Sequence, residues 1–309
     1  MKLHVDSPGL GENTGPRTFT NRLLKHLLMT RNIELVDNGQ DADISFVVIE
    51  PSGVPLAKKI VHRLDGIWSA PNGFVKNNTL MKRMYEHADT VIFQSLFDKN
   101  FIVHNWGLPN DHHIIRNGVP IKPVTQFASK ELEHIRQKFE RVYVCSAHWH
   151  PQKRLGDNIR LFKELERRSG KSSCLLILGP NPDVMFAGSN IFYAGSVPDD
   201  VYMEIYAMAD WMIHLAWRDH CPNTVVECLS QNTPVICTDD GGTAEVIDGF
   251  GVVLHDSSDP KNLEPFDYDD PPSVDVLQPF DLITRSSCPD VSIETAAAHY
   301  MNVFSNLLT

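Results

Sequence analysis

The fold of this chain is decided by nine residues, DHCPNTVVE, which run from Asp219 to Glu227. A carboxylate in a loop comes first, a proline and an asparagine follow where a helix should begin, and a second carboxylate lies eight residues after the first. The apolar run 211–216 stands directly before this stretch. The strand-like run 234–237 follows it and leads into DDGG at 239–242. An acidic loop and a helix start therefore lie between two strands.

α/β proteins use this arrangement to hold phosphorylated ligands. The free N–H groups in the first turn of a helix face a phosphate, and neighbouring carboxylates can accept hydrogen bonds from sugar hydroxyls. Asp219 and Glu227 are the candidate carboxylates, and the helix start at Asn223 is the candidate phosphate site.

Strand-like and helix-like segments alternate along most of the chain. Before residue 118, short β-branched runs such as 44–49 and 90–93 alternate with helical stretches such as 79–87 and 96–106. A turn signal, NGVP at 117–120, ends this pattern, which restarts with a strand at 142–145. Short buried strands that alternate with helices predict parallel sheets covered on both faces.

We therefore expect an α/β protein with two Rossmann-like domains, residues 1–118 and 119–290, whose sheets face each other across a cleft. Residues 291–309 are predicted to form a C-terminal helix that can pack back on the N-terminal domain. The acidic, proline-rich segment 255–290 is predicted to be irregular.

Composition excludes several classes of protein. A net charge of −11 makes non-specific binding of nucleic acid unexpected. No apolar run approaches the roughly 20 residues that span a bilayer. The sequence leaves a peripheral membrane contact open, but no feature of it indicates one. Six cysteines without a CxxC pair are typical of reduced thiols, so a cytoplasmic location is predicted.

Three further motifs follow predicted strands. A glycine-rich turn at 9–16, which includes Gly15, could bring the backbone close to a phosphate or could be a plain turn. His148, Lys153 and Arg154 follow another strand and suit a diphosphate, although surface charge is the alternative. The paired histidines of HWH at 148–150 lack a third ligand at suitable spacing, so no metal site is predicted.

The third motif, HRLDG at 62–66, ends a strand of the first half. Asp65 is well placed to meet a ligand in the cleft. Arg63 or Asp65 could equally form a structural ion pair, and the residues alone leave these two readings open.

These motifs, in this order, resemble the retaining glycosyltransferases of the GT-B fold, close to glycosyltransferase family 4 (glycosyl transferases group 1). Asp219, Pro222-Asn223 and Glu227 match the E-x7-E signature of that family with PN between the acids. The remaining matches are TPVI at 233–236, GGTAE at 241–245, ADTVIFQS at 88–95, NGV at 117–119 and PQK at 151–153.

The resemblance implies a role for each matching residue. Glu227 would bind the ribose of a nucleotide-sugar donor, and Asp219 would hold the transferred sugar. Lys153 would neutralise the diphosphate, and the catalytic set would be Asp219, Glu227 and Lys153. Further donor-binding positions are Gly15, His148, Arg154, Gly195, Val197, Cys221, Pro222, Asn223 and Thr224. Arg63 and Asp65 would lie on the acceptor and sugar side.

The sequence also departs from the family pattern. The first acid is Asp219 rather than glutamate, and His148 stands where the family usually has an arginine. A histidine is only partly charged near neutral pH, so Arg154 could be needed as a substitute.

The resemblance implies a metal-independent, retaining hexosyltransferase that needs no cofactor beyond its nucleotide-diphosphate-sugar substrate, UDP- or GDP-linked. Its acceptor would be a glycan or another hydroxyl compound. Two alternatives stay open, a GT-B-like nucleotide- or glycan-binding protein with little or no activity and a sugar-nucleotide epimerase on the same fold.

Overall fold

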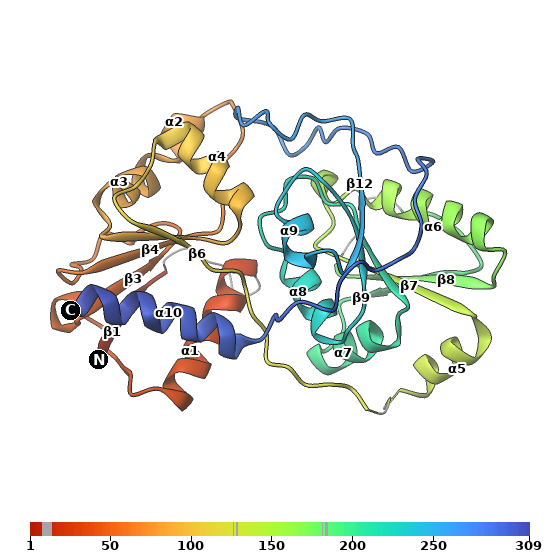
Figure 1. Cartoon of the computed structure of the whole chain (residues 1–309), viewed down its shortest axis with the longest axis horizontal. Helices are drawn as coiled ribbons and strands as arrows, with labels where there is room; N and C mark the ends of the chain where they lie inside the picture. The colour runs from red at the N-terminus through yellow and green to blue at the C-terminus, as the bar shows by residue number, and fades with distance from the viewer. Residues whose placement is uncertain (8–13, 126, 128, 181, 183–184) are drawn as a thin grey trace.

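The computed structural model describes residues 1–309 except 8–13, 126, 128, 181 and 183–184. Figure 1 shows two lobes side by side, each with a sheet and its helices. Among the described residues each lobe contains a sheet of six strands, and every strand pair in both sheets is parallel. The predicted α/β class with two parallel sheets is confirmed.

The sheet of the first domain has the strand order β2-β1-β3-β4-β5-β6. Its strands are β1 (Lys2–Asp6), β2 (Glu34–Leu35), β3 (Ile44–Val48), β4 (Ile60–Leu64), β5 (Thr90–Phe93) and β6 (His112–Ile114). Its helices are α1 (Gly15–Thr30), η1 (Gly39–Asp41), α2 (Phe74–Asn77), α3 (Thr79–His87) and α4 (Leu96–Trp106). Every residue of β3 and β5 is buried, as expected for strands covered on both faces.

The sheet of the second domain has the order β12-β11-β10-β7-β8-β9. Its strands are β7 (Arg141–Ser146), β8 (Ser173–Leu178), β9 (Ile191–Gly195), β10 (Trp211–His214), β11 (Val235–Thr238) and β12 (Gly251–Leu254). Its helices are α5 (Lys130–Lys138), η2 (Pro151–Lys153), α6 (Leu155–Ser169), α7 (Asp199–Met208), α8 (Asn223–Ser230) and α9 (Thr243–Ile247).

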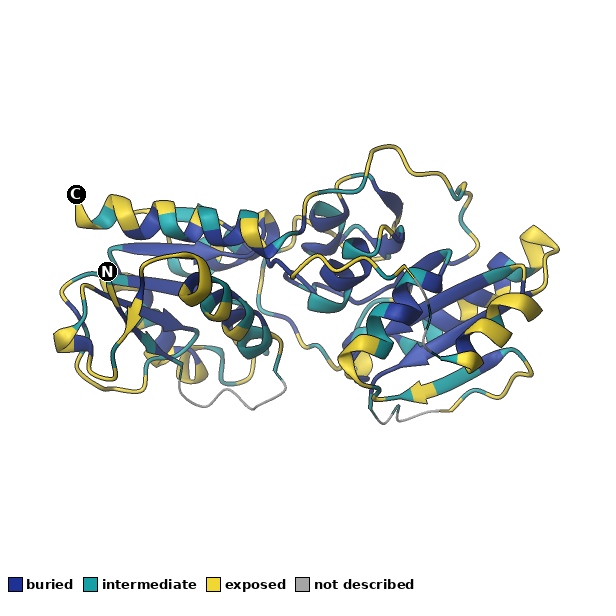
Figure 2. Ribbon diagram, turned by 90° about the horizontal axis from the view of Figure 1, so that it is seen from below, coloured by how far each residue is buried: buried dark blue, intermediate teal, exposed yellow. Residues whose placement is uncertain are grey.

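Each sheet separates two apolar cores. In β7, Val142 and Val144 belong to one core, whereas Tyr143 and Cys145 belong to the other, because side chains alternate between the faces of a strand. Figure 2 shows strands of both domains largely buried, while the helices alternate buried and exposed positions. The helices thus cover both faces of each sheet and leave the strand ends available for a site.

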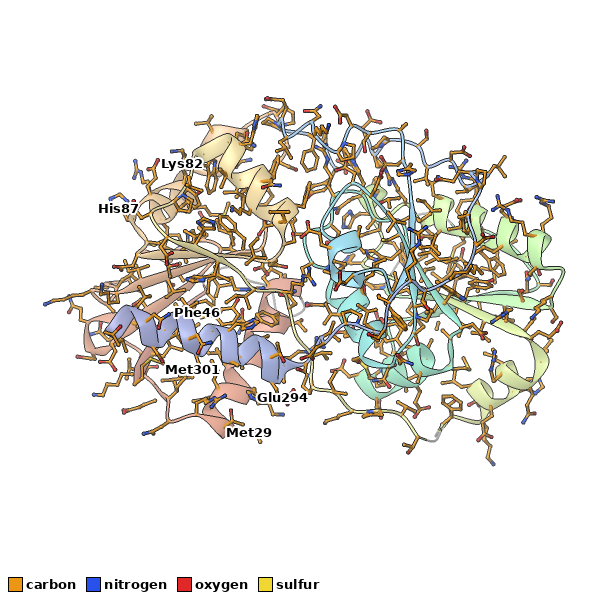
Figure 3. The ribbon with its side chains drawn as sticks, viewed as in Figure 1. Met29, Phe46, Lys82, His87, Glu294 and Met301 are labelled. Atoms are coloured by element: carbon orange, nitrogen blue, oxygen red, sulfur yellow. The ribbon has the colours of Figure 1, made fainter. Side chains whose placement is uncertain are left out.

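The C-terminal helix α10 (Ile293–Leu308) packs on the first domain, although the chain reaches it from the second. Ser292 caps its start by accepting a hydrogen bond from the Thr295 N–H. Phe46 of β3 lies against this helix, with ring centroids 5.6 Å from Tyr300 and 5.8 Å from Phe304 (Figure 3). Aromatic packing therefore fastens the end of the chain to the first sheet.

The segment 255–290 contains no helix or strand, so the predicted irregular structure is confirmed for this described stretch. Figure 1 shows it running along the upper edge from the second lobe to the first and back. Phe266 is buried with Trp217 in an apolar cluster of the first domain, and its N–H donates to the Ser69 carbonyl at 2.8 Å. Segment 255–290 therefore contacts both domains and joins them.

Two further properties concern the whole described chain. None of its helices is long and apolar enough to cross a membrane. All six cysteines are free thiols, and burial raises the pKa of each of them.

Candidate functional site

A cleft of about 810 Å³ lies between the two domains, where the carboxyl ends of strands from both sheets meet. From the first domain it is lined by Gly15, Pro16, Thr18, Arg22, Asp65, Gln94 and Asn117. From the second it is lined by Ser146, Ala147, His148, Lys153, Gly179, Pro180, Ser196, Val197, Asp199, Tyr202, Met203, His214, Asp219, His220, Cys221, Pro222, Asn223, Thr224 and Glu227. The stretch 219–227 thus contributes seven of the lining residues.

Tight backbone packing fixes the loop that carries Asp219. A Cβ atom added to Gly242 would lie 1.9 Å from the His220 carbonyl oxygen, so only glycine fits there. The Gly242 N–H donates to the Asp219 carbonyl at 2.7 Å. The DDGG motif therefore holds the acidic loop in place.

The start of helix α8 faces the cleft. Its first turn has Pro222 at the N-cap, and no side chain caps it. The helix dipole and the N–H groups of this turn favour an anion at this point. The Asn223 side chain donates to the Gly15 carbonyl at 2.8 Å and accepts from Asn117 at 2.9 Å. These contacts join the helix start to the first domain.

Asp219 is neutralised from within its own domain. Its carboxylate forms a short ion pair with Lys153, and His214 Nε2 lies 3.4 Å from Oδ2. Burial alone would raise the pKa of Asp219, but the Lys153 charge and the His214 imidazole outweigh it and hold the pKa far below its usual range. Burial also lowers the pKa of His214, more than Asp219 raises it. The Asp219 carboxylate is therefore held in its charged form between Lys153 and an imidazole that burial keeps from being protonated easily.

Glu227 is neutralised from the opposite domain. Arg22 of α1 donates from Nη2 to Oε1 of Glu227 at 2.6 Å, and both side chains are largely buried. Burial raises the pKa of Glu227 above its usual value although Arg22 opposes this effect, and the nearby negative charge of Asp199 adds to it. The two acids of the motif are therefore in different electrostatic settings.

Asp65 forms a buried ion pair with Arg63, with Nη1 of the arginine 2.5 Å from Oδ1 of the acid. The arginine is fully buried, stacks over the Phe19 ring at 4.5 Å and donates to Asn117 at 2.8 Å. Burial raises the pKa of Asp65, Arg63 opposes the shift and Asp98 adds to it. Of the two readings that the sequence left open, the structural ion pair is therefore present, and Asp65 nevertheless lines the cleft.

A second buried pair crosses between the domains. His220 Nδ1 lies 2.9 Å from Oδ1 of Asp98 on α4. Burial would lower the pKa of His220, but Asp98 reverses the shift and raises it. The imidazole fits closely against Gly66, where an added Cβ would come within 2.5 Å of Nε2 and where φ is +94°. This pair thus needs both domains in their present arrangement.

Most of the predicted site residues line the cleft, but Arg154 and Gly195 of the donor set and Arg63 of the acceptor and sugar side do not. Arg154 is buried, pairs with Asp256 at 2.9 Å and donates to the Leu215 carbonyl at 3.2 Å, so its guanidinium has no access to a diphosphate. The prediction of Arg154 as a substitute cation is therefore wrong. Arg63 forms its ion pair with Asp65 and does not line the cleft. Gly195 ends β9 and accepts from the Gly179 N–H, while its neighbours Ser196 and Val197 line the cleft.

Residues 9–13 of the predicted glycine-rich turn lie outside the described residues, and Gly15 and Pro16 of that turn line the cleft.

Sequence reasoning missed several lining residues, notably Arg22, Gln94, Asn117, Tyr202 and His214. His214 had a usable signal, since a polar residue at the last position of an apolar strand points to a strand-end site. No sequence signal pointed to Arg22, because a basic residue on the polar side of a helix is typical of any surface helix.

Among the described residues, no group of three or more His, Cys, Asp or Glu side chains is arranged to hold a metal ion. Besides its histidines, the cleft is lined by two basic and four acidic side chains. These charges suit a ligand with both phosphate and hydroxyl groups.

Comparisons with known proteins agree with this geometry. Residues 129–264, which include most of the second domain, match the family described as Glycosyl transferases group 1. The chain is 22% identical over 222 residues to the uncharacterized glycosyltransferase MJ1069 of Methanocaldococcus jannaschii. This match covers 65% of the chain and 56% of that relative, so the chain matches little more than half the length of the curated relative.

Two solved structures share the whole fold. HepE of Anabaena, in complex with UDP and glucose, has a TM-score of 0.66 at 13% identity and covers 99% of this chain and 100% of its own. A glycosyltransferase of Rickettsia africae has a TM-score of 0.65 at 14% identity, with 100% and 98% covered. The fold is therefore the GT-B fold, and the match to the glycosyl transferases group 1 family lies in its second domain.

Proposed function

We propose that this chain is a retaining glycosyltransferase of family 4. It would transfer a hexose from a UDP- or GDP-linked donor to a hydroxyl of a glycan or another acceptor, without a metal ion. The observation that carries the proposal is the pair of unequally neutralised carboxylates, Asp219 and Glu227, beside an uncapped helix start in a cleft between two sheets.

The proposed donor pose assigns one group to each part of the ligand. Glu227 accepts hydrogen bonds from the ribose hydroxyls, and the slot beside Val197 takes the base. The first turn of α8 and Lys153 hold the diphosphate, and Asp219 holds the transferred sugar. HepE has been solved with UDP-glucose, which supports a nucleotide-sugar pose on this fold. A cleft of about 810 Å³ lies within the usual size of small-molecule sites, roughly 300–1,000 Å³.

The proposed chemistry needs no side-chain base. The bond between the sugar C1 and the diphosphate oxygen breaks, the acceptor oxygen bonds to C1 on the same face, and the leaving phosphate takes the acceptor proton. The protein positions the two substrates and stabilises the negative charge that develops on the leaving diphosphate. Lys153 and the α8 dipole are the groups placed for the second task.

A thermal-shift screen with UDP-, GDP-, ADP- and TDP-sugars tests donor recognition. A selective donor raises the melting temperature by linkage, and about 2.7 kcal/mol is expected at a hundredfold excess over Kd. NMR of the product made from the selected donor then gives the configuration at C1. Absence of stabilisation by every sugar nucleotide contradicts the proposed donor site, and an inverted product contradicts retention.

The same screen separates the alternatives. A protein that binds but does not transfer gives a shift without release of nucleotide, and an epimerase converts the free donor without an acceptor. The cytoplasmic location remains a separate prediction, which cell fractionation tests.

A further inference from the structure

The cleft has few cations for a diphosphate ligand. Among its described lining residues only Arg22 and Lys153 are arginine or lysine, against the four acids Asp65, Asp199, Asp219 and Glu227. Lys153 already forms an ion pair with Asp219. Arg154, the other basic candidate, is buried against Asp256 and does not line the cleft. A ligand with two or more negative charges therefore needs a further cation from within the cleft.

Arg22 has the position and the spare hydrogen-bonding capacity for this task. It lies on α1 of the first domain, its side chain is 19% exposed, and it reaches across the cleft to Glu227 at 2.6 Å. Its Nη2 makes this bond, whereas Nη1 is buried without a hydrogen-bond partner in the described structure. A buried guanidinium nitrogen without an acceptor is costly, so the site is complete only when an acceptor is supplied.

A diphosphate would supply that acceptor. The planar fork of an arginine matches two oxygens of a phosphate, and such charge-assisted pairs are stronger than neutral hydrogen bonds. Glu227 would lose its arginine at the same time as the ribose hydroxyls offer it new donors. The exchange leaves neither buried charge unpaired, which is the condition for moving a buried ion pair at low cost.

We propose, resting on the proposed function, that Arg22 is a diphosphate-binding residue that the first domain supplies across the cleft, and that Glu227 holds it in place until the nucleotide arrives. The Arg22–Glu227 ion pair thus marks where two parts of the donor bind. Since Arg22 and Lys153 come from different domains, the diphosphate would join the domains.

Calorimetric titration of matched variants with UDP, GDP, uridine and guanosine tests this role. Arg22→Gln removes the charge, Arg22→Lys keeps it without the fork, and Lys25→Gln is the control. Lys25 is an exposed residue of the same helix outside the cleft lining, so its removal changes the net charge equally. Melting curves of each variant verify that it folds.

For the diphosphate that the parent binds, we expect Arg22→Gln to weaken binding by about ten- to a hundredfold. Binding of the matching nucleoside should be unchanged, because it carries no phosphate. Arg22→Lys should restore part of the diphosphate affinity, and Lys25→Gln should bind like the parent.

Equal binding of the diphosphate by Arg22→Gln and the parent overturns this inference and leaves the proposed function intact. Equal weakening for nucleoside and diphosphate also overturns it, since Arg22 would then act only by placing Glu227. A parent that binds neither UDP nor GDP overturns the inference together with the proposed function. Should Arg22→Gln not fold, the same comparison with Arg22→Lys decides, because loss of the bidentate fork weakens only phosphate-containing ligands.

Discussion

The two halves of the cleft neutralise their charges differently. On the second-domain side, Lys153 and Asp219 pair with side chains about 15% exposed, at a strand end and beside a helix start. On the first-domain side, Arg63 and Asp65 pair with side chains no more than 4% exposed. A partly open pair can exchange its partner for a ligand, whereas a buried pair cannot without a large desolvation cost. The second domain therefore contributes an ion pair that a ligand can exchange, Lys153–Asp219, whereas the first domain contributes an ion pair that burial holds fixed, Arg63–Asp65.

Arg22 is the exception that connects the two halves. It belongs to the first domain, but its partner is an acid of the second, and the pair is as open as Lys153–Asp219. Together with the His220–Asp98 pair, it makes the arrangement of the two domains depend on charges at the site. The apolar contacts of segment 255–290 also join the domains.

The largest effect should come from breaking the buried Arg63–Asp65 pair. Asp65→Asn leaves the Arg63 guanidinium buried without its counter-ion, so the free energy of unfolding should fall by roughly 3–5 kcal/mol, measured by denaturant titration. The double variant Arg63→Leu with Asp65→Asn, which removes both charges, should recover much of that loss. An unchanged stability of Asp65→Asn would show that the pair is not the structural element described here.

A smaller effect is expected from breaking the partly exposed Lys153–Asp219 pair. Lys153→Met removes the cation beside Asp219, so binding of the donor diphosphate should weaken about a hundredfold, measured by calorimetry. Its effect on stability should stay well below that of Asp65→Asn because Lys153 is partly exposed. Lys163→Met, an exposed lysine on α6 outside the cleft lining, is the matched control. Binding as tight as in the parent would contradict the division between the two halves.

The smallest effect concerns pH. Asp98 raises the folded-state pKa of His220 above its unfolded value, so the pair contributes stability that is fully present below the unfolded pKa of about 6.5. That contribution is lost as the pH rises through the folded pKa. Relative to His220→Gln, the parent should therefore lose melting temperature between pH 6 and pH 9, by roughly 2–4 °C.

The opposite slope is expected from His62, His150 and His214, whose pKa values burial lowers. They are present in both proteins, and so is Tyr268, which faces His220 at 3.3 Å. The difference between parent and variant therefore isolates the pair, and identical pH profiles would contradict its role.

The same contrast explains how far sequence reasoning reaches. The second-domain half was predictable because strand ends, DDGG and the helix start at Asn223 are local signals. The α/β class and the irregular segment 255–290 followed from periodicity and composition. In the first-domain half, Gly15 and Asp65 were predicted because they follow strands. Arg22, Gln94 and Asn117 were not predictable, since they meet the site only through the packing of one domain on the other. Arg154 was mispredicted because sequence cannot show that Asp256, about a hundred residues away, occupies its guanidinium.

The most direct test of the account separates the two acids of DHCPNTVVE. It measures UDP or GDP binding and donor turnover in Asp219→Ala, Glu227→Ala and the exposed control Asp200→Ala. Asp219→Ala should bind the nucleotide within about threefold of the parent but lose roughly a hundredfold or more in turnover, because its acid would contact only the sugar. Glu227→Ala should lose nucleotide affinity itself. Turnover and binding like the parent in both variants would contradict the assignment of this cleft as the donor site.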